Sequence, residues 1–456
     1  NAGGAGTSAN YDVDTENPTV SSIGLGDTDV VTGDTPTLTI VFSSAVSGFA
    51  SADDVTCENG ALSTMSSSDD ITWTGTFTPS GSTTDLSNTC SVGTGYTDDA
   101  GNTGVAGQSA NYKVDTVAPT VSSITFADTA LKAGDTSLVT IVFSEAVTGF
   151  ANADLSIASG TMTAVQNGAG DGITWTSTFT PTADTDDNTN VLGITANSYT
   201  DTLGNNGGAG TSSNYVVETL LPTLTMSIAS DNDVTTLAKS GDTVTLSITA
   251  SETVTSLVCT IDGEATTMGG SGTGWTSALT LSGDETEGAI GVSCASFVDA
   301  AGNTGVTDTT VNTGTVTVDL TAPTVGIGTV ATDGYINAAE ASSFTITGTA
   351  SGANGQTVTV TYGGASETAT VSAGTWTLTM CDDESCTHSA GLSAVTANVN
   401  DAAGNAATQA NVNAWYDATA PTTSISSIDI SADTGSSATD FITKTAAQTV
   451  TATLSA

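Results

Sequence analysis

Short runs in which apolar and polar residues alternate recur along the chain. The run 38–42, Leu-Thr-Ile-Val-Phe, returns almost unchanged at 139–143, and the run 71–77 around Trp73 returns at 173–179. Alternation with a period of two is typical of strands that bury one face, and β-branched residues favour strands. Strong helix formers other than Ala are scarce, which argues against helices. The pattern therefore predicts an all-β chain built from half-buried strands.

A proline-containing motif recurs about every hundred residues and divides the chain into segments of similar length. It reads Val-Asp-Thr-Val-Ala-Pro-Thr in one copy, and its five copies occupy residues 13–19, 114–120, 217–223, 318–324 and 416–422. The prolines of successive copies lie 101, 103, 101 and 98 residues apart. Proline fixes φ and favours an extended residue before it, which suits a stiff link between domains. The length between two links is that of one β-sandwich.

These links give the predicted domain boundaries. Residues 18–117, 118–220, 221–321 and 322–419 are four complete sandwiches, named domains 1 to 4 below. Residues 1–15 match residues 205–219 at 11 of 15 positions, so residues 1–17 are expected to be the last strand of a preceding domain with its link. Residues 420–456 are expected to begin a truncated fifth domain. We therefore expect a window cut from a longer array, with any signal peptide, anchor or terminal binding module outside it.

A second marker precedes each later link by about fifteen residues. It has the form Asp-x-x-Gly-Asn and occurs at residues 98–102, 201–205, 299–303 and 401–405. These residue types tolerate left-handed φ and favour turns. We predict that the motif is the hairpin loop between the last two strands of each domain.

Charge is scarce and almost entirely acidic. The chain has 48 Asp and Glu against four Lys and no Arg, giving a net charge of −44. Without the cations that displace counterions from phosphates, binding to nucleic acid or to acidic membrane surfaces is excluded, whereas divalent cations would be attracted. The apolar residues, 38% of the total, fall in strand-like runs, which argues against disorder. No apolar stretch of about 18 residues occurs, so no transmembrane helix is expected in this window.

Domain 2 carries the residues of a family resemblance. They are Gly134-Asp135-Thr136, residues 139–150, Asp154-Leu155, residues 171–175 and Thr178-Phe179-Thr180-Pro181. These segments resemble the bacterial Ig-like repeats of very large cell-surface adhesins of the RTX or biofilm type. The resemblance is close over domains 1 and 2, whereas domains 3 and 4 share the link and the turn but diverge between them.

The resemblance implies tandem immunoglobulin-like β-sandwich domains in an extended array. It also implies secretion, attachment to the cell surface, and rigid extension promoted by calcium at the domain junctions. S-layer and sheath proteins of some prokaryotes also use Ig-like repeats, so the resemblance leaves the role open.

The six cysteines fall in pairs within single domains, Cys57 with Cys90, Cys259 with Cys294, and Cys381 with Cys386. Domain 2 aligns with domain 1 yet lacks both partners of the first pair, which favours a bond over two independent thiols. Intradomain disulfides imply an oxidising, extracellular or cell-surface location. Buried free thiols are the alternative, mainly for the second pair. The acidic loop of the third pair could instead clip a cation, although its spacing is poor for zinc.

Acidic residues of the links and turns are the candidate metal ligands. In an Ig-type sandwich the turn between the last two strands and the turn after the second strand lie where the chain enters the domain. A hard cation that takes six to eight oxygens could clamp the clustered carboxylates, so calcium is the expected cofactor. The expected groups are Asp14 with Asp98 and Asp99; Asp115 with Asp201 and Glu145; Glu218 with Asp299 and Glu252; and Asp319 with Asp401. Ser44 stands where Glu145 would be in domain 1, which predicts a weaker site there. The alternative is that these residues are turn formers and solubilising charge.

Catalysis is not expected. His388 is the only histidine, and without Arg or a second His there is no triad, phosphate clamp or zinc site. We predict for it a role in a surface turn beside the Cys386 loop. Trp73, Trp175, Trp275 and Trp376 are expected to anchor one core each, with Trp415 beside the last link as the exception.

The sequence thus predicts a non-catalytic, calcium-stiffened stalk of a bacterial surface protein that serves cell adhesion or biofilm formation. The alternative is a subunit of a surface lattice or an extracellular filament or sheath, which self-association would favour. A third class, a carbohydrate-binding appendage on an enzyme, needs an exposed aromatic platform, whereas the aromatics are 5% of the chain and mostly assigned to cores. Expected partners are other domains of the same long chain, with self-association or surface glycans possible; no nucleic acid and no membrane contact is expected within this window.

Overall fold

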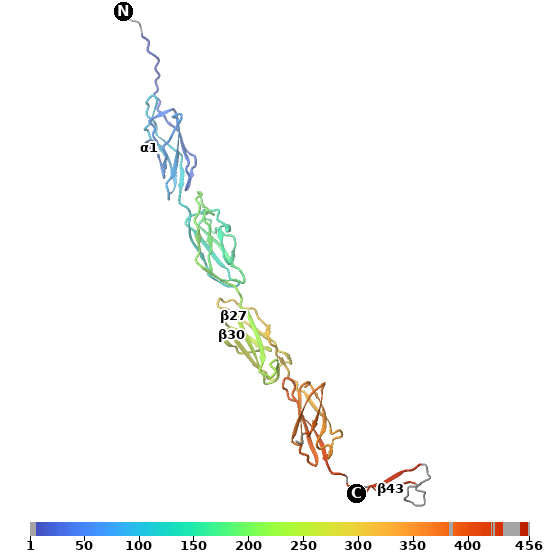
Figure 1. Cartoon of the computed structure of the whole chain (residues 1–456). Helices are drawn as coiled ribbons and strands as arrows, with labels where there is room; N and C mark the ends of the chain where they lie inside the picture. The colour runs from blue at the N-terminus through green and yellow to red at the C-terminus, as the bar shows by residue number, and fades with distance from the viewer. Residues whose placement is uncertain (1–5, 383–385, 421, 423–424, 432–446, 455–456) are drawn as a thin grey trace, which may run out of the picture. The chain divides into compact units, whose positions relative to one another are not determined.

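The computed structural model describes residues 6–382, 386–420, 422, 425–431 and 447–454. Within them nearly all of the regular secondary structure is strand, joined by turns and irregular segments; the helices are the four-residue α1 (Ser51–Asp54) and the 3-10 turn η1 (Asn152–Asp154). Figure 1 shows the strands gathered into successive sandwiches along the chain. The prediction of an all-β chain of tandem Ig-like sandwiches is confirmed. By contact density the chain divides into two compact units, residues 1–222 with 299–304, and residues 223–298 with 305–456.

Domain 1 is built from one four-stranded sheet and three small sheets. The four-stranded sheet has the order β1 (Val20–Leu25), β3 (Thr37–Phe42), β7 (Thr72–Pro79) and β6 (Gly60–Leu62). The small sheets are β2 (Asp29–Val30), β12 (Tyr112–Asp115) and β8 (Thr84–Asn88); β11 (Gly107–Gln108), β9 (Cys90–Val92) and β5 (Val55–Cys57); and β10 (Thr97–Asp98) with β4 (Val46–Ser47).

Domain 2 repeats this arrangement sheet by sheet, as its sequence likeness to domain 1 predicts. Its four-stranded sheet has the order β13 (Val121–Phe126), β15 (Ser137–Phe143), β19 (Thr174–Pro181) and β18 (Gly160–Met162). The small sheets are β14 (Ala130–Leu131), β24 (Tyr215–Glu218) and β20 (Asp186–Asn190); β17 (Leu155–Ser156), β21 (Gly193–Ile194) and β23 (Gly210–Thr211); and β16 (Val147–Thr148) with β22 (Thr200–Asp201).

Domains 3 and 4 have longer strands in fewer sheets. The sheets of domain 3 are β30 (Gly269–Thr280), β27 (Thr243–Val254), β25 (Leu224–Ser230) and β33 (Val311–Thr313); β26 (Leu237–Ala238), β34 (Thr317–Val318) and β31 (Gly288–Ala289); and β29 (Glu264–Ala265), β28 (Val258–Ile261) and β32 (Val292–Ala295). Those of domain 4 are β35 (Thr324–Val330), β37 (Phe344–Ser351) and β40 (Thr375–Met380); and β36 (Tyr335–Asn337), β42 (Ala410–Asp417), β41 (Gly391–Asn398), β38 (Thr357–Tyr362) and β39 (Ala365–Thr370).

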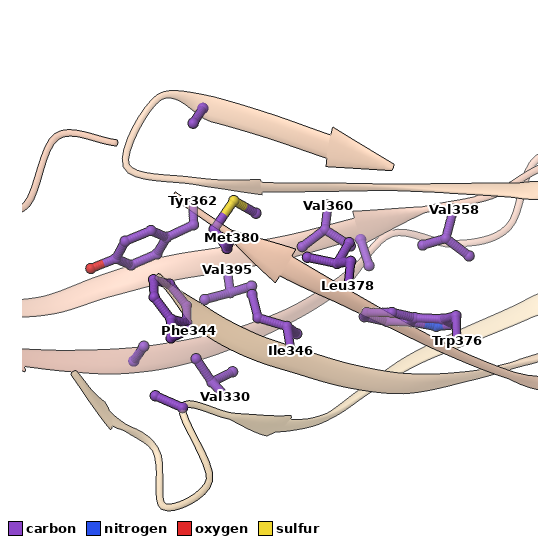
Figure 2. Packing of buried hydrophobic residues seen from close by; sticks show 14 of the residues in the cluster. Val330, Phe344, Ile346, Val358, Val360, Tyr362, Trp376, Leu378, Met380 and Val395 are labelled. Carbon is purple, nitrogen blue, oxygen red and sulfur yellow. The ribbon is translucent and has the colours of Figure 1, made fainter. Parts of the chain in front are cut away.

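The cores follow from the alternation in the sequence. In β3 the side chains of Leu38, Ile40 and Phe42 are at most 2% exposed, while their neighbours along the strand face outward or lie at the rim. Each of the four buried clusters draws its residues from one domain. Figure 2 shows the cluster of domain 4, in which Phe344 and Trp376 lie among aliphatic side chains. Burial of such apolar area is the main force that holds a sandwich of this size together.

The tryptophans differ from the prediction that each anchors a core. Trp376 is 2% exposed and central, whereas Trp73, Trp175 and Trp275 pack against their clusters only at the rim. Each rim indole donates its N–H to a carbonyl three residues earlier, and that polar group keeps the ring at the surface of the core. The smaller, fully apolar Phe77 occupies the centre of domain 1 in their place.

The Asp-x-x-Gly-Asn motif forms a turn in each domain, but it joins a true hairpin only in domain 4. There β41 and β42 pair along their length around residues 401–405. In domain 1 only Thr97 and Thr103 pair across the turn, because β10 joins β4 while β12 joins β2 and β8. The strands that flank the turn also pair elsewhere in domains 2 and 3, so the prediction of a hairpin between the last two strands is wrong for domains 1 to 3.

The two ends of the chain carry little described structure. Residues 6–19 form no strand in the described part, and a strand at 1–17 stays a prediction because it needs neighbouring strands with which to pair. Near the other end, β43 (Ile425–Ile430) pairs with β44 (Val450–Leu454) in a two-stranded ribbon. Pro421 of the last link and residues 432–446 of the predicted fifth domain lie outside the described residues.

Candidate metal-binding junctions

The aspartate that opens each Asp-x-x-Gly-Asn turn organises the turn itself. In domain 2 one oxygen of Asp201 accepts the backbone N–H groups of Leu203, Gly204 and Asn205, and the other accepts the side-chain amide of Asn205 at 2.8 Å. Asp201 is 2% exposed. Asp201 therefore stabilises the turn, which is the alternative role that the sequence left open.

The same bonds lower the pKa of the equivalent aspartates. The pKa of Asp98 lies below its ordinary value because the side-chain amide of Asn102 and three backbone N–H groups of the turn bond the ionised form. At Asp299, burial raises the pKa, but hydrogen bonds from Asn303 and Gly302 outweigh it and the net direction is downward. Both carboxylates are therefore charged at neutral pH.

The asparagine that closes each turn reaches back to the preceding link. Its side-chain amide donates to the backbone carbonyl of the acidic link residue in all four domains. The pairs are Asn102 with Asp14 at 3.3 Å, Asn205 with Asp115 at 2.9 Å, Asn303 with Glu218 at 3.0 Å and Asn405 with Asp319 at 2.8 Å. Sequence reasoning took this asparagine for a turn former. Its recurrence at one fixed position of every turn was the signal that could have revealed the contact.

Two of these asparagines also accept a hydrogen bond from the domain before. The carbonyl oxygen of Asn205 accepts the N–H of Thr32 at 2.9 Å, and that of Asn303 accepts the N–H of Ala133 at 2.7 Å. Thr32 and Ala133 stand at equivalent places in domains 1 and 2, just after β2 and β14. A single amide thereby bonds its own turn, the link and the preceding sandwich.

Three carboxylates meet at the junction between domains 1 and 2. One oxygen each from Asp115, Glu145 and Asp201 lies within 4.8 Å of the others, and this is the only such group of three His, Cys, Asp or Glu among the described residues. Asp115 and Asp201 are buried and Glu145 is half-buried. Burial, together with the charges of Asp115 and Asp201, raises the pKa of Glu145. The structure brings together the trio that the sequence proposed, and its all-oxygen donor set fits a hard divalent cation.

The other predicted groups are arranged differently. Asp14 and Asp99 are exposed while Asp98 is buried, and the three form no group of ligand atoms. Glu218 and Asp299 both contact the amide of Asn303, at 2.5 and 2.9 Å. Asp319 and Asp401 meet at Asn405, through a backbone carbonyl and a carboxylate respectively. Glu252 is half-buried in β27 and belongs to the second compact unit.

A lysine lies against the turn at the two junctions that follow domains 2 and 3. The stem of Lys132 lies 3.4 Å from where a Cβ on Gly302 would stand, and that of Lys239 lies 3.1 Å from the same point on Gly404. Each ammonium pairs with an aspartate three residues later in its own domain, at 3.2 and 3.3 Å. The residue equivalent to these lysines at the Asp115 junction is Val31. Of the three junctions between domains 1 and 4, the one with three carboxylates is therefore the one without a lysine at this place.

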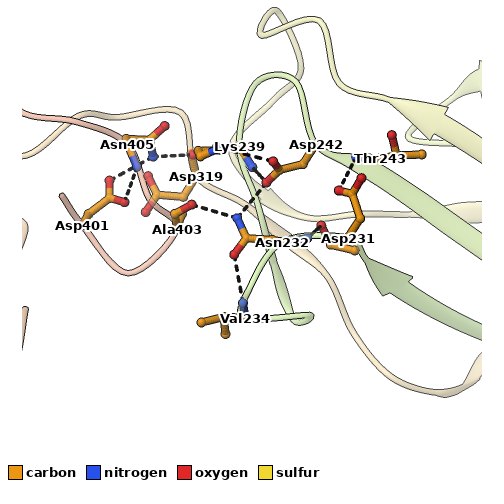
Figure 3. Close-up of polar contacts among 11 residues, drawn as sticks. Asp231, Asn232, Val234, Lys239, Asp242, Thr243, Asp319, Asp401, Ala403 and Asn405 are labelled. Atoms are coloured by element: carbon orange, nitrogen blue, oxygen red, sulfur yellow. Dashed lines mark hydrogen bonds and ion pairs between the residues drawn. The ribbon is translucent and has the colours of Figure 1, made fainter.

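Figure 3 shows the polar contacts at the Asp319 junction. Asn232 donates to Asp242 at 2.7 Å and, across the junction, to the carbonyl oxygen of Ala403 at 2.8 Å. Domain 3 thus holds the turn of domain 4 through side-chain amides and a lysine stem. Hydrogen bonds and a side-chain contact therefore close this junction.

The cysteines and the histidine take structural places. Disulfides join Cys57 to Cys90, Cys259 to Cys294 and Cys381 to Cys386, the same pairs that the sequence suggests. Residues 383–385 of the third loop lie outside the described residues. His388 is half-buried rather than in a free surface turn, because its ring stacks on Tyr416 at 4.7 Å and its Nε2 lies 2.7 Å from the carbonyl oxygen of Ala341.

The fold, the links and the disulfides define a class of protein, tandem repeats of the Ig-like sandwich. Within that class, the family model described as "Bacterial Ig-like domain" matches residues 14–114 and 115–217. The first two repeats are therefore bacterial Ig-like domains. A comparison with curated proteins gave no match. In the described residues no helix is long and apolar enough to cross a membrane.

Three solved structures that match this chain do so at low identity and low TM-score. A chain titled for host cell surface retention of a 1.5-MDa bacterial ice-binding adhesin is 21% identical, with 66% of this chain and 98% of that chain covered and a TM-score of 0.33. Fibronectin(III)-like modules of Clostridium thermocellum CbhA are 17% identical, with 42% and 94% covered and a TM-score of 0.24. Domains A168–A170 of titin are 12% identical, with 66% and 100% covered and a TM-score of 0.25.

Replacing Asn205 by Ala is expected to lower the free energy of unfolding by about 1–3 kcal/mol, because the Asp115 carbonyl and the Thr32 N–H lose this partner at a largely buried site. Urea unfolding of the full chain measures the loss. Asn206→Ala is the matched control, since Asn206 is the adjacent residue and exposed. Equal losses for the two variants would contradict the role of Asn205 at the junction.

Proposed function

We propose that the chain is a non-catalytic repeat region of a large bacterial surface protein, an extracellular stalk that serves cell adhesion or biofilm formation. The observation that carries the proposal is the repeated junction: in every domain the turn asparagine bonds the link that precedes it. A junction contact that recurs with each repeat suits a chain whose domains must keep a fixed relation to their neighbours. The match of two repeats to bacterial Ig-like domains and the three disulfides support a bacterial, extracellular setting.

Small-angle X-ray scattering of the purified full chain tests the stalk. A compact protein of 456 residues would have a radius of gyration of about 22 Å, whereas four sandwiches in line would roughly double it. A monomer with the larger value is expected. A radius of gyration near that of a compact particle would disprove the stalk. Ordered sheets or fibres that form on addition of calcium would favour the lattice or filament instead.

We propose further that calcium binds at the Asp115 junction and stiffens it. Three carboxylates at this distance repel one another, and the raised pKa of Glu145 reflects first its burial and then that repulsion. A cation held by Asp115 from the link and by Glu145 and Asp201 from domain 2 would turn the repulsion into attraction. The remaining oxygens of its coordination would come from water and backbone carbonyls.

Calorimetric titration of the full chain with calcium, after removal of metal by chelation, is expected to show a site with a dissociation constant of roughly 0.1–1 mM, as in other extracellular modules. Glu145→Ser introduces the residue that domain 1 has at this place, Ser44, and should weaken binding at least tenfold. Asp53→Asn, which removes an exposed acid of α1, is the control for net charge. Calcium binding that is unchanged in Glu145→Ser would disprove this assignment.

A further inference from the structure

Two aromatic side chains face solvent side by side on domain 4. Tyr335 of β36 and Trp415 of β42 are direct partners in a parallel pair, and they are 60% and 44% exposed. Leu392 of β41, on the other side of Trp415, is 60% exposed. Adjacent strands lie about 4.8 Å apart, so the three side chains form one apolar row. The opposite face of the same sheet is the packed core that Figure 2 shows, with Val360 and Val395 turned inward.

A polar hollow of about 310 Å³ adjoins this row. It is lined by Thr329, Thr332, Asp333 and Asn413 together with Gly328, Val330, Gly334 and Val412. Asn413 lies two residues before Trp415 on β42 and therefore on the same face of the sheet. The N–H of Trp415 donates to the carbonyl of Gly334 at 3.1 Å, which joins the rim of the hollow to the aromatic pair.

The loop that leads into Tyr335 has an unusual backbone. Ala331, Thr332 and Gly334 have φ values of 48°, 66° and 87°, in the left-handed region. A β-branched residue such as Thr332 is rarely found there, and such strain tends to collect at functional sites. The carboxylate of Asp333 accepts the N–H of Tyr335 at 3.0 Å and fixes the loop. The strained loop thus gives the hollow a defined wall.

We propose that this surface of domain 4 binds a neutral glycan. The flat faces of Tyr335 and Trp415 fit the apolar face of a pyranose ring, and hydroxyl, amide and carboxylate groups in the hollow fit its hydroxyls. The described residues that line the hollow include no cation, and with a net charge of −44 the chain repels anionic glycans. The proposal is independent of the stalk function. From the sequence, most aromatic side chains are expected to lie in cores. Tyr335 and Trp415 are exposed instead, and Trp415 is the tryptophan that the sequence already set apart.

Affinity electrophoresis of the full chain tests the proposal, in native gels that contain soluble neutral polysaccharides (laminarin, mannan, dextran, xyloglucan) or anionic alginate. At least one neutral polysaccharide is expected to retard the chain, and alginate is not. Trp415→Ala and Tyr335→Ala should weaken retardation at least tenfold, while Tyr335→Phe should keep it because the ring face remains. Tyr11→Ala, which removes an 81% exposed aromatic elsewhere, is the matched control and should bind like the unaltered chain.

Three outcomes would overturn the proposal. The first is the absence of retardation in every neutral gel, and the second is retardation that Trp415→Ala leaves unchanged while circular dichroism shows an intact fold. The third is concentration-dependent association of the chain that Trp415→Ala abolishes, which would assign the face to a second copy.

Discussion

Removing the Cys57–Cys90 disulfide is expected to lower the free energy of unfolding of domain 1 by about 3–4 kcal/mol. The bond closes a loop of 33 residues, and the loss follows from the chain entropy that the unfolded state regains. The two cysteines are direct partners between β5 and β9, and Cys90 is fully buried in the core. For a domain of about one hundred residues, a loss of this size lowers Tm by more than 10 °C.

Domain 2 is a control built into the same chain. At the places of Cys57 and Cys90 it has Ile157 and Leu192, and Leu192 is likewise fully buried. Calorimetry of the full chain with and without a reductant should therefore shift the transition of domain 1 and leave that of domain 2 in place. The double variant Cys57→Ala/Cys90→Ala should reproduce the shift without a reductant. A transition of domain 1 that does not move, in either experiment, would contradict the expectation.

How much the sequence predicts can be judged from these two domains. The alternation at 38–42 and 139–143 predicted the buried faces of β3 and β15. Side chains of a strand alternate between its two faces, so covering one face determines which residues are buried. The joint absence of two cysteines from domain 2 pointed to the pair that the structure joins. Both inferences depend on local pattern and on comparison between repeats, which a single sequence supplies.

The contacts that hold the junctions could not be predicted in the same way. Asn205 donates to a carbonyl 90 residues earlier and accepts from an N–H 173 residues earlier, so neither contact leaves a local pattern. Tyr335 and Trp415 are 80 residues apart in sequence and meet only because β36 and β42 run parallel. The prediction of a hairpin in domain 1 was wrong for the same reason. The strands that pair with β10 and β12 come from distant parts of the domain sequence.

Tyr199→Ala is expected to lower the free energy of unfolding of domain 2 by about 3–5 kcal/mol, because it leaves a large cavity in the core. The ring of Tyr199 is 2% exposed and packs on Phe143 and Phe150, with centroids 4.8 and 6.0 Å away. It also lies against Gly207, where an added Cβ would stand 2.1 Å from the ring. Tyr199→Phe keeps all of this and removes only the hydrogen bond from the hydroxyl to the carbonyl of Gly208, at 2.7 Å. Its cost should be about 1 kcal/mol.

The comparison of the two variants also tests how the core supports the junction. Tyr199 lies two residues before Asp201, so loss of its ring should loosen the turn that presents Asp201 to Asp115 and Glu145. Calorimetric titration with calcium, at a temperature where domain 2 of both variants is folded, is therefore expected to show weaker binding in Tyr199→Ala and ordinary binding in Tyr199→Phe. Equal stability of the two variants would refute the cavity argument. Ordinary calcium binding in a destabilised Tyr199→Ala would show instead that the link and the turn hold their geometry without the ring beneath them.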